Sequence, residues 1–236
     1  MVSNIFNTGK RLTMNGLELT KLKTDLFTNG FVSFNIKDVD VELYNELEIA
    51  IPPNSLNPSE FTNLQSSIIN PFNNPKPEFE NTIENTPFDE LDLIKKKILK
   101  NYTSENGYSL DQIWFYKNIK SRNILDFRHK IYSLFYPSIG NCGTKITLYN
   151  DECFLINHQD NMLGNRDCAL LVYLSTEWNE SKGGELVIDN TTIVPPIYGQ
   201  VAILDFTKHN PYHMVNKVNG FNRYCLISFC NPTIVK

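Results

Sequence analysis

The sequence predicts a mainly β protein with helices at its N-terminus. Residues 17 to about 102 show mostly helical periodicity, whereas from about residue 109 short apolar segments alternate with turn sequences. The strand candidates are 113–116, 145–149, 154–158, 169–174, 185–188, 201–206, 212–215 and 223–229. Because these segments are short and no helix is expected between them, they favour an antiparallel sandwich or barrel.

The N-terminal part is expected to begin with an amphipathic helix. Apolar residues between 17 and 27 form a rough stripe, and Asn29-Gly30, a helix stop signal, closes it. Residues 31–34 then have the pattern of a short strand. Residues 39–49 predict a second helix, which Pro52-Pro53 ends.

Two further helices are predicted from their start signals. Asn57-Pro58-Ser59-Glu60 offers an N-cap, a proline at the first helical position and an acid at the third, and Thr86-Pro87-Phe88-Asp89 repeats the pattern before the apolar residues of 91–99. Between these two helices lies the segment 70–85, rich in Pro and Asn. A loop this long in a compact domain is either disordered or a functional lid. We expect it to lie near the functional site and to order when substrate binds.

Composition excludes several classes of partner. The chain has 236 residues, of which 41% are hydrophobic and 20% charged, and its net charge is only −4. Without a long basic run there is no electrostatic footprint for nucleic acid. No apolar stretch approaches the roughly 20 residues needed to span a bilayer. The sequence therefore predicts neither a nucleic-acid partner nor a membrane protein, and it does not indicate the oligomeric state.

The cysteines bear on the cellular compartment. None of the five has CxxC spacing, which argues against a zinc site or a disulfide framework and favours a reducing compartment, with the cytoplasm as the default. Cys225 and Cys230 are expected to be small core residues. The complete set is Cys142, Cys153, Cys168, Cys225 and Cys230.

A possible metal site lies at the end of one predicted strand. In His158-Gln159-Asp160 the two outer residues are two positions apart, so a strand would point both side chains to one face. His213, at the start of another predicted strand, supplies a third ligand. Two His and one carboxylate with open positions form the facial triad of non-haem iron(II) oxygenases. An HxD pair alone is weak evidence, because a surface His beside an acid gives the same pattern.

Arg223 strengthens that interpretation. It opens a predicted strand and shares a strand face with Cys225, Ile227 and Phe229, so its guanidinium would project into an apolar interior. A buried Arg needs an anion, either an acidic protein partner or a bound ligand. 2-Oxoglutarate chelates iron through its C1 carboxylate and C2 ketone. Its C5 carboxylate can be bound bidentately by the planar guanidinium of an arginine.

These residues lie in segments that resemble prolyl-4-hydroxylase-like iron(II)/2-oxoglutarate-dependent oxygenases. The resemblance covers about 149–230 and is closest to the hypoxia-sensing prolyl hydroxylase branch in the C-terminal half. It extends loosely to the N-terminal helix and to Asn29-Gly30-Phe31-Val32. The segments that carry it are Tyr149 to Asp160, Cys168 to Trp178, Gly183-Gly184-Glu185-Leu186, Asn210 to Val215 and Arg223-Tyr224.

The resemblance implies a fold and roles for individual residues. We expect a double-stranded β-helix (jelly-roll, cupin-like) core at about 109–232, with residues 1–108 as a helical N-terminal support that has one or more strands. A single domain is expected because the first half lacks enough strands to close a core of its own. Tyr173 would share the C5 carboxylate with Arg223, Tyr149 would line the iron pocket, and Arg166 would lie near the substrate. For Tyr149 and Tyr173 ordinary sheet packing stays open, as does a solvated loop position for Arg166. Where this chain has Glu152 and Leu155, the family often has Gly and Tyr, so the turn and one wall of the pocket must differ here.

The implied function is that of an iron(II)- and 2-oxoglutarate-dependent dioxygenase. It would hydroxylate an unactivated C–H bond of a prolyl residue, a free amino acid or another small molecule, with succinate and CO2 as co-products. The cofactors implied are Fe(II), 2-oxoglutarate and O2, with ascorbate as an additional reductant. The alternatives are a non-catalytic jelly-roll binding module and a zinc-dependent hydrolase. His209, in a turn, and His129, in a basic stretch, are expected at the surface.

Overall fold

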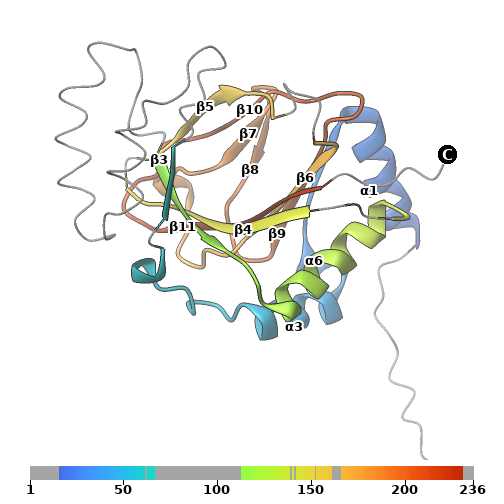
Figure 1. Cartoon of the computed structure of the whole chain (residues 1–236). Coiled ribbons are helices and arrows are strands. Elements are labelled where there is room, and N and C mark those ends of the chain that lie inside the picture. The colour runs from blue at the N-terminus through green and yellow to red at the C-terminus, as the bar shows by residue number, and fades with distance from the viewer. Residues whose placement is uncertain are drawn as a thin grey trace, which may run out of the picture.

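Two antiparallel sheets face each other, and helices cover the outer face of the larger sheet (Figure 1). The structure is a computed structural model that describes residues 16–61, 63–66, 113–138, 140, 142–151, 153–160 and 166–230. The larger sheet has the order β1 (Phe31–Asn35), β9 (Gln200–Asp205), β6 (Cys168–Tyr173), β11 (Arg223–Cys230), β4 (Cys142–Tyr149), β3 (Ile113–Asn118) and β2 (Asn63–Ser66). The smaller sheet has the order β5 (Leu155–His158), β10 (His213–Val215), β7 (Leu186–Ile188) and β8 (Thr192–Val194).

Capping residues mark the end of the first helix and the start of the next two. Gly30, with φ at +80°, ends the first helix, and a Cβ there would collide with the His209 ring. The side chains of Asn35 and Asp40 accept hydrogen bonds from backbone N–H groups at the start of the next two. The α-helices are α1 (Gly16–Asn29), α2 (Ile36–Val39), α3 (Val41–Ala50) and α6 (Arg122–Phe135), and the 3₁₀ turns are η1 (Pro58–Glu60) and η4 (Glu180–Lys182).

Strand alternation divides the apolar residues between two cores. On the outer face, Leu26 of α1, Leu47 of α3 and Phe127 of α6 pack on the sheet. On the inner face, Leu171 and its alternating neighbours meet the small sheet. The fully buried inner residues are Ala169, Tyr173, Ile188, Val194, Ala202 and Leu204. The expected mainly β jelly-roll core with N-terminal helices is confirmed.

Two expectations about local structure are wrong. A helix, α6, lies between β3 and β4, where none was expected; its buried residues Ile124, Phe127, Ile131 and Phe135 have helical spacing. The helix expected at Asn57 is only the single turn η1, in which Asn57 Oδ1 accepts from the Ser59 N–H at 3.1 Å. The chain then enters β2, which pairs with β3. Strand pairing therefore prevails over the local start signal.

The cysteine expectation is wrong for one pair. Cys142 and Cys230 are directly opposite in the β4–β11 register, with their Cα atoms 4.2 Å apart, and their sulfurs are bonded. Sequence spacing does not reveal this pair, since 88 positions separate its members. Cys153, Cys168 and Cys225 are free and buried, so the core role expected for Cys225 is confirmed.

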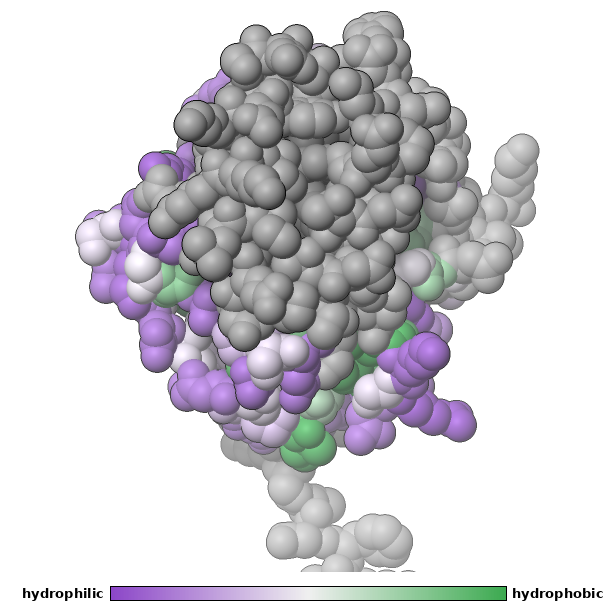
Figure 2. All heavy atoms as spheres, turned by 60° about the vertical axis from the view of Figure 1, so that its left-hand side comes forward, coloured by the Kyte–Doolittle hydropathy of each residue, from purple (hydrophilic) through white to green (hydrophobic). Residues whose placement is uncertain are grey.

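The helix predicted near 86–99 and the segment 70–85 lie outside the described residues. Within the described ranges, no helix is long and apolar enough to cross a membrane. On the face shown in Figure 2, the coloured surface is largely hydrophilic, and hydrophobic residues come to it at only a few separate places.

The contrast between buried and exposed positions of α3 gives a test of the outer core. Leu47 is 0% exposed, whereas Ile49 on the same helix is 75% exposed. We expect Leu47→Ala to lower the free energy of unfolding by about 2–5 kcal/mol because it leaves a cavity. Ile49→Ala should change it by about 0.5 kcal/mol or less. Urea unfolding of both variants measures the difference, and equal effects would show that α3 does not pack as described.

Candidate metal and co-substrate site

Three possible metal ligands meet at one edge of the small sheet. His158 is the last residue of β5 and His213 the first of β10, and the two are directly paired across the antiparallel strands. Asp160 follows His158 by two residues, as an extended chain requires for both side chains to share a face. The ligand atoms of all three lie within 4.8 Å of one another.

The carboxylate of Asp160 bridges the two imidazoles. His158 Nε2 lies 3.5 Å from Oδ1 and His213 Nε2 lies 3.4 Å from Oδ2. The ring centroids of the two histidines are 4.3 Å apart. Both Nε2 atoms and the carboxylate thus converge on one point, and no rotamer change is needed to aim them at a shared cation.

Neighbouring backbone groups hold this arrangement. His213 Nδ1 lies 3.1 Å from the Pro211 carbonyl oxygen, so an N–H at Nδ1 donates there and leaves the Nε2 lone pair for a metal. Gln159 Nε2 donates to the Asn210 carbonyl at 2.5 Å, which ties the end of β5 to the segment before β10. The middle residue of the HxD motif therefore fixes the distance between the two strands that carry the histidines.

The electrostatics keep the carboxylate ionised. Burial raises the pKa of Asp160, but hydrogen bonds and charge from His158 and His213 lower it more, so the pKa lies well below its ordinary value. A carboxylate that stays ionised is a ligand ready for a divalent cation.

Arg223 is buried between the two sheets, 2% exposed. Its Nε donates to the Gly184 carbonyl at 2.6 Å, and a terminal nitrogen lies 3.4 Å from the Tyr173 hydroxyl. Its Cζ is 5.0 Å from the ring centroids of both Tyr149 and Tyr173. Among the described residues, no carboxylate lies within 4.0 Å of the guanidinium. The alternative of an acidic protein partner thus finds no support within the described ranges, and an anionic ligand suits the position.

Tyr173 and Tyr149 flank the guanidinium from the two neighbouring strands. Tyr149 lies opposite Arg223 in β4, and Tyr173 ends β6 on the other side of β11. Burial raises the pKa of each hydroxyl well above its ordinary value, although the Arg223 charge lowers it. Both hydroxyls therefore stay protonated and can donate to an anion held by Arg223.

Arg166 lies beside the three possible metal ligands. Its Nη1 is 3.4 Å from Asp160 Oδ1, and its Cζ lies 3.9 Å from the Phe229 ring centroid. Sequence reasoning missed Lys145, which the β4–β11 register places opposite Ile227 on the inner face. Burial and the charge of Arg166 lower the pKa of Lys145 to about 8, against the charge of Asp160, which raises it. Strand alternation from Tyr149 back to residue 145 could have revealed this lysine.

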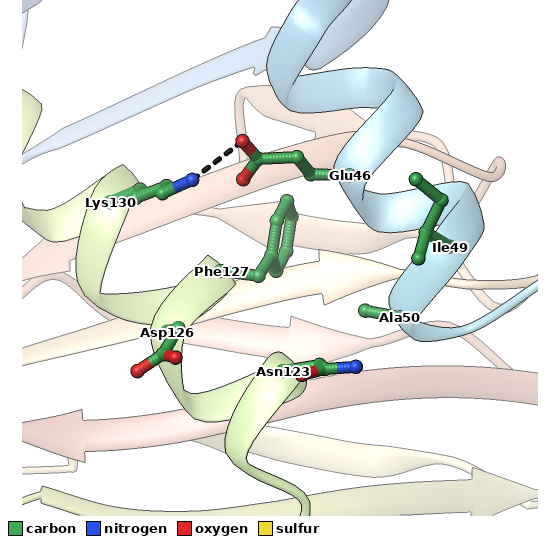
Figure 3. Close-up of a pocket in the computed structure, with 7 residues that line it drawn as sticks. All are labelled: Glu46, Ile49, Ala50, Asn123, Asp126, Phe127 and Lys130. Atoms are coloured by element: carbon green, nitrogen blue, oxygen red, sulfur yellow. Dashed lines mark hydrogen bonds and ion pairs between the residues drawn. The ribbon is translucent and has the colours of Figure 1, made fainter.

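The two other histidines lie away from this cluster. His209 is exposed in the turn after β9, and His129 is exposed on α6. A pocket between α3 and α6 lies on the outer side of the large sheet (Figure 3). Phe127 and the ion-paired Lys130 and Glu46, 2.5 Å apart, line it, and none of the candidate site residues does.

The position of Arg223 requires a glycine at residue 184. Its φ is +76°, and an added Cβ would lie 3.2 Å from atoms of Arg223, Phe221 and Val218. We expect Gly184→Ala to lower the free energy of unfolding by about 1–3 kcal/mol, because a non-glycine residue is strained there. Gly143→Ala is the matched control, since nothing lies within 4 Å of its added Cβ. Urea unfolding compares the two, and a neutral Gly184→Ala would remove the proposed constraint.

The donor set fits a transition metal. Two imidazole nitrogens and one carboxylate oxygen leave coordination positions open, as non-haem iron(II) requires. A buried arginine with a hydroxyl beside it fits the far carboxylate of a dicarboxylic co-substrate. Among described residues, these are the groups that could hold iron(II) and 2-oxoglutarate.

Comparison with known proteins agrees with this chemistry. Residues 144–231 match the model of the 2OG-Fe(II) oxygenase superfamily. Among solved structures, the chain resembles a prolyl-4-hydroxylase from Pseudomonas putida, with 13% identity, a TM-score of 0.53, and coverage of 90% of this chain and 98% of the other. It also resembles a prolyl hydroxylase from Trichoplax adhaerens in complex with a hypoxia inducible factor peptide fragment, with 16% identity, a TM-score of 0.52, and coverage of 93% and 94%.

No curated protein sequence matches the chain. At such low identities the structural similarity shows the fold, and it is the fold expected for the resemblance. The matched family implies Fe(II), 2-oxoglutarate and O2 as cofactors. The match of residues 144–231 to the model of the 2OG-Fe(II) oxygenase superfamily confirms the resemblance, the enzyme class and these cofactors inferred from the sequence.

Proposed function

We propose that this protein hydroxylates an unactivated C–H bond, using iron held by His158, Asp160 and His213 and 2-oxoglutarate held by Arg223. The observation that carries the proposal is the pairing of an open 2-His-1-carboxylate cluster with a buried arginine on the inner face of one jelly roll. When bound, iron(II) and 2-oxoglutarate supply the oxidation of the C–H bond by dioxygen, with succinate and CO2 as co-products.

The protein residues bind and orient the reactants. Arg223 and the Tyr173 hydroxyl hold the far carboxylate of 2-oxoglutarate, and Tyr149 closes the pocket from β4. The Pro211 carbonyl fixes the tautomer of His213, and the lowered pKa of Asp160 keeps its charge available. The apolar residues around Arg223 exclude water, which strengthens each charged contact in the site.

The substrate is proposed at the level of a class. A prolyl residue of a peptide or protein, a free amino acid or another small molecule fits the reaction, and the 3.4 Å contact of Arg166 with Asp160 supports a role of Arg166 in facing such a substrate. Ascorbate as a reductant, one domain over 1–236 and a cytoplasmic location stay predictions from the sequence, as does the absence of a nucleic-acid or membrane partner.

Two alternatives make different use of the same residues. A zinc-dependent hydrolase could use the two histidines and the carboxylate, but it would leave Arg223 and Tyr173 without a role. A non-catalytic jelly-roll module would not need the cluster and the buried arginine together. Consumption of 2-oxoglutarate with iron(II) and ascorbate, compared with zinc, distinguishes the three.

The metal ligands are tested by single substitutions. His158→Ala, Asp160→Ala and His213→Ala should each abolish iron-dependent conversion of 2-oxoglutarate to succinate, because each removes one of three protein ligands. His209→Ala is the matched control, since His209 is an exposed histidine four positions from His213. Succinate release and thermal unfolding are measured together. Near-wild-type turnover in any folded ligand variant would show that the residue does not bind the metal.

The co-substrate contact is tested at Arg223. Arg223→Gln should raise the apparent KM for 2-oxoglutarate by about ten- to a hundredfold, since a hydrogen bond to a charged group contributes about 1.5–3 kcal/mol. Tyr173→Phe should act in the same direction more weakly. Arg122→Gln, in a side chain that is 90% exposed, is the control. An unchanged KM in folded Arg223→Gln, with folding checked by circular dichroism, would place the co-substrate elsewhere.

A further inference from the structure

The inner face of the β4–β11 strand pair carries positive charge at both ends. Residues directly opposite in an antiparallel pair project to the same side, so Lys145, opposite Ile227, shares the inner face with Tyr149 and Arg223. Ile227 packs against the inner core, which confirms that this face points between the sheets. Lys145 precedes Tyr149 by four positions, so the two ends lie roughly 13 Å apart along the strand.

Arg166 lies with Lys145 at the end of the inner face that is next to the three possible metal ligands. It precedes β6, reaches Asp160 Oδ1 at 3.4 Å and stacks over Phe229, the inner-face residue two positions after Ile227. The pKa of Lys145 is lowered to about 8, chiefly by burial, and the charges of Arg166 and Asp160 act on it in opposite directions. The register sets Lys145 beside Ile227 and next to Phe229, over which Arg166 stacks, so the two cations share the end of the inner face near Asp160, apart from Arg223.

The surroundings of this pair suit an organic anion. The planar guanidinium of Arg166 binds a carboxylate bidentately, and the Lys145 ammonium adds a second charged donor. Ile227 and Phe229 form an apolar wall next to both groups. A molecule whose carboxylate meets the two cations would place its carbon chain against this wall, close to the three metal ligands.

We propose that Lys145 and Arg166 bind a carboxylate of the oxidised substrate, which makes the substrate an organic acid. This rests on the proposed function, because it assigns 2-oxoglutarate to Arg223 and iron to the cluster. The carboxylate belongs either to a free amino acid or to the C-terminal residue of a peptide. An internal residue of a polypeptide, whose carboxyl group is an amide, lacks the charge that this pair recognises.

The first experiment compares acids with their amides. The full-length protein with iron(II), 2-oxoglutarate and ascorbate is given free L-amino acids including proline, their α-amides, and prolyl peptides with a free or amidated C-terminus. Succinate release and mass gain of one oxygen atom are measured. We expect acids to exceed the matched amides by at least about tenfold in turnover at low concentration, as loss of a charge-assisted contact implies. Activity with the free amino acids or only with the peptide acids identifies the source of the carboxylate.

The second experiment separates substrate binding from co-substrate binding. Lys145→Met and Arg166→Gln should each raise the apparent KM for the active acid by at least about tenfold, and by much more than the KM for 2-oxoglutarate. Lys208→Met, at an exposed turn residue, is the control. Titration calorimetry of the acid into each folded variant under anaerobic conditions measures the same loss as binding.

Several results would overturn the inference. Amides as active as acids, or no active acid in a protein that does consume 2-oxoglutarate, would exclude recognition by charge. A rise in KM for 2-oxoglutarate alone would assign the pair to the co-substrate. Absence of 2-oxoglutarate consumption under all conditions would instead refute the proposed function, and this inference with it.

Discussion

Burial of the Arg223 guanidinium constrains much of this structure. A charged group that is 2% exposed has lost its water, so its N–H groups must find acceptors inside the protein. One acceptor is the Gly184 carbonyl just before β7 of the small sheet, and another is the Tyr173 hydroxyl at the end of β6 in the large sheet. The same side chain therefore links both sheets, and the gap between them must remain wide enough for a guanidinium but closed to solvent.

That constraint explains why Gly184 is the residue at its position. A larger residue would need a strained backbone at φ +76° and would meet the Arg223 side chain itself. Tyr149, opposite Arg223 in β4, closes the third side with its ring. The pocket for an anion is thus formed by contacts that also hold the fold, and the site and the fold cannot be changed independently.

The sequence predicts contacts between site residues that are close along the chain better than contacts between residues that are far apart. Convergence of His158 and Asp160 follows from the period of two in a strand, which is local and visible in the sequence. The meeting of His158 with His213 depends on the antiparallel register of β5 and β10, which strand patterns do not specify. The sequence offered His213 as a ligand of the right type at the start of a strand, and the family resemblance implied the same residue. Lys145 was overlooked although its alternation with Tyr149 was visible, because a lysine near the start of a strand suggests solvent.

The same distinction explains the errors in the fold. The spacing of buried residues in α6 is helical and could have been recognised, but the strand candidates on both sides led to the prediction of no helix there. At Asn57 the local cap is real, yet pairing with β3 makes residues 63–66 a strand rather than a longer helix. Bonding of Cys142 to Cys230 likewise depends on register rather than on spacing. Local signals were informative about where elements start, and long-range pairing decided what they became.

The two positively charged ends of the inner face differ in their access to solvent. Arg223 is enclosed, whereas the side chain of Arg166 is 36% exposed. An enclosed cation suits a ligand whose shape is the same in every turnover, because each contact can be built into the fold. A partly exposed cation suits a ligand that enters, reacts and leaves. The difference in exposure between Arg223 and Arg166 therefore agrees with co-substrate at Arg223 and an anionic substrate at Lys145 and Arg166, beside the metal ligands.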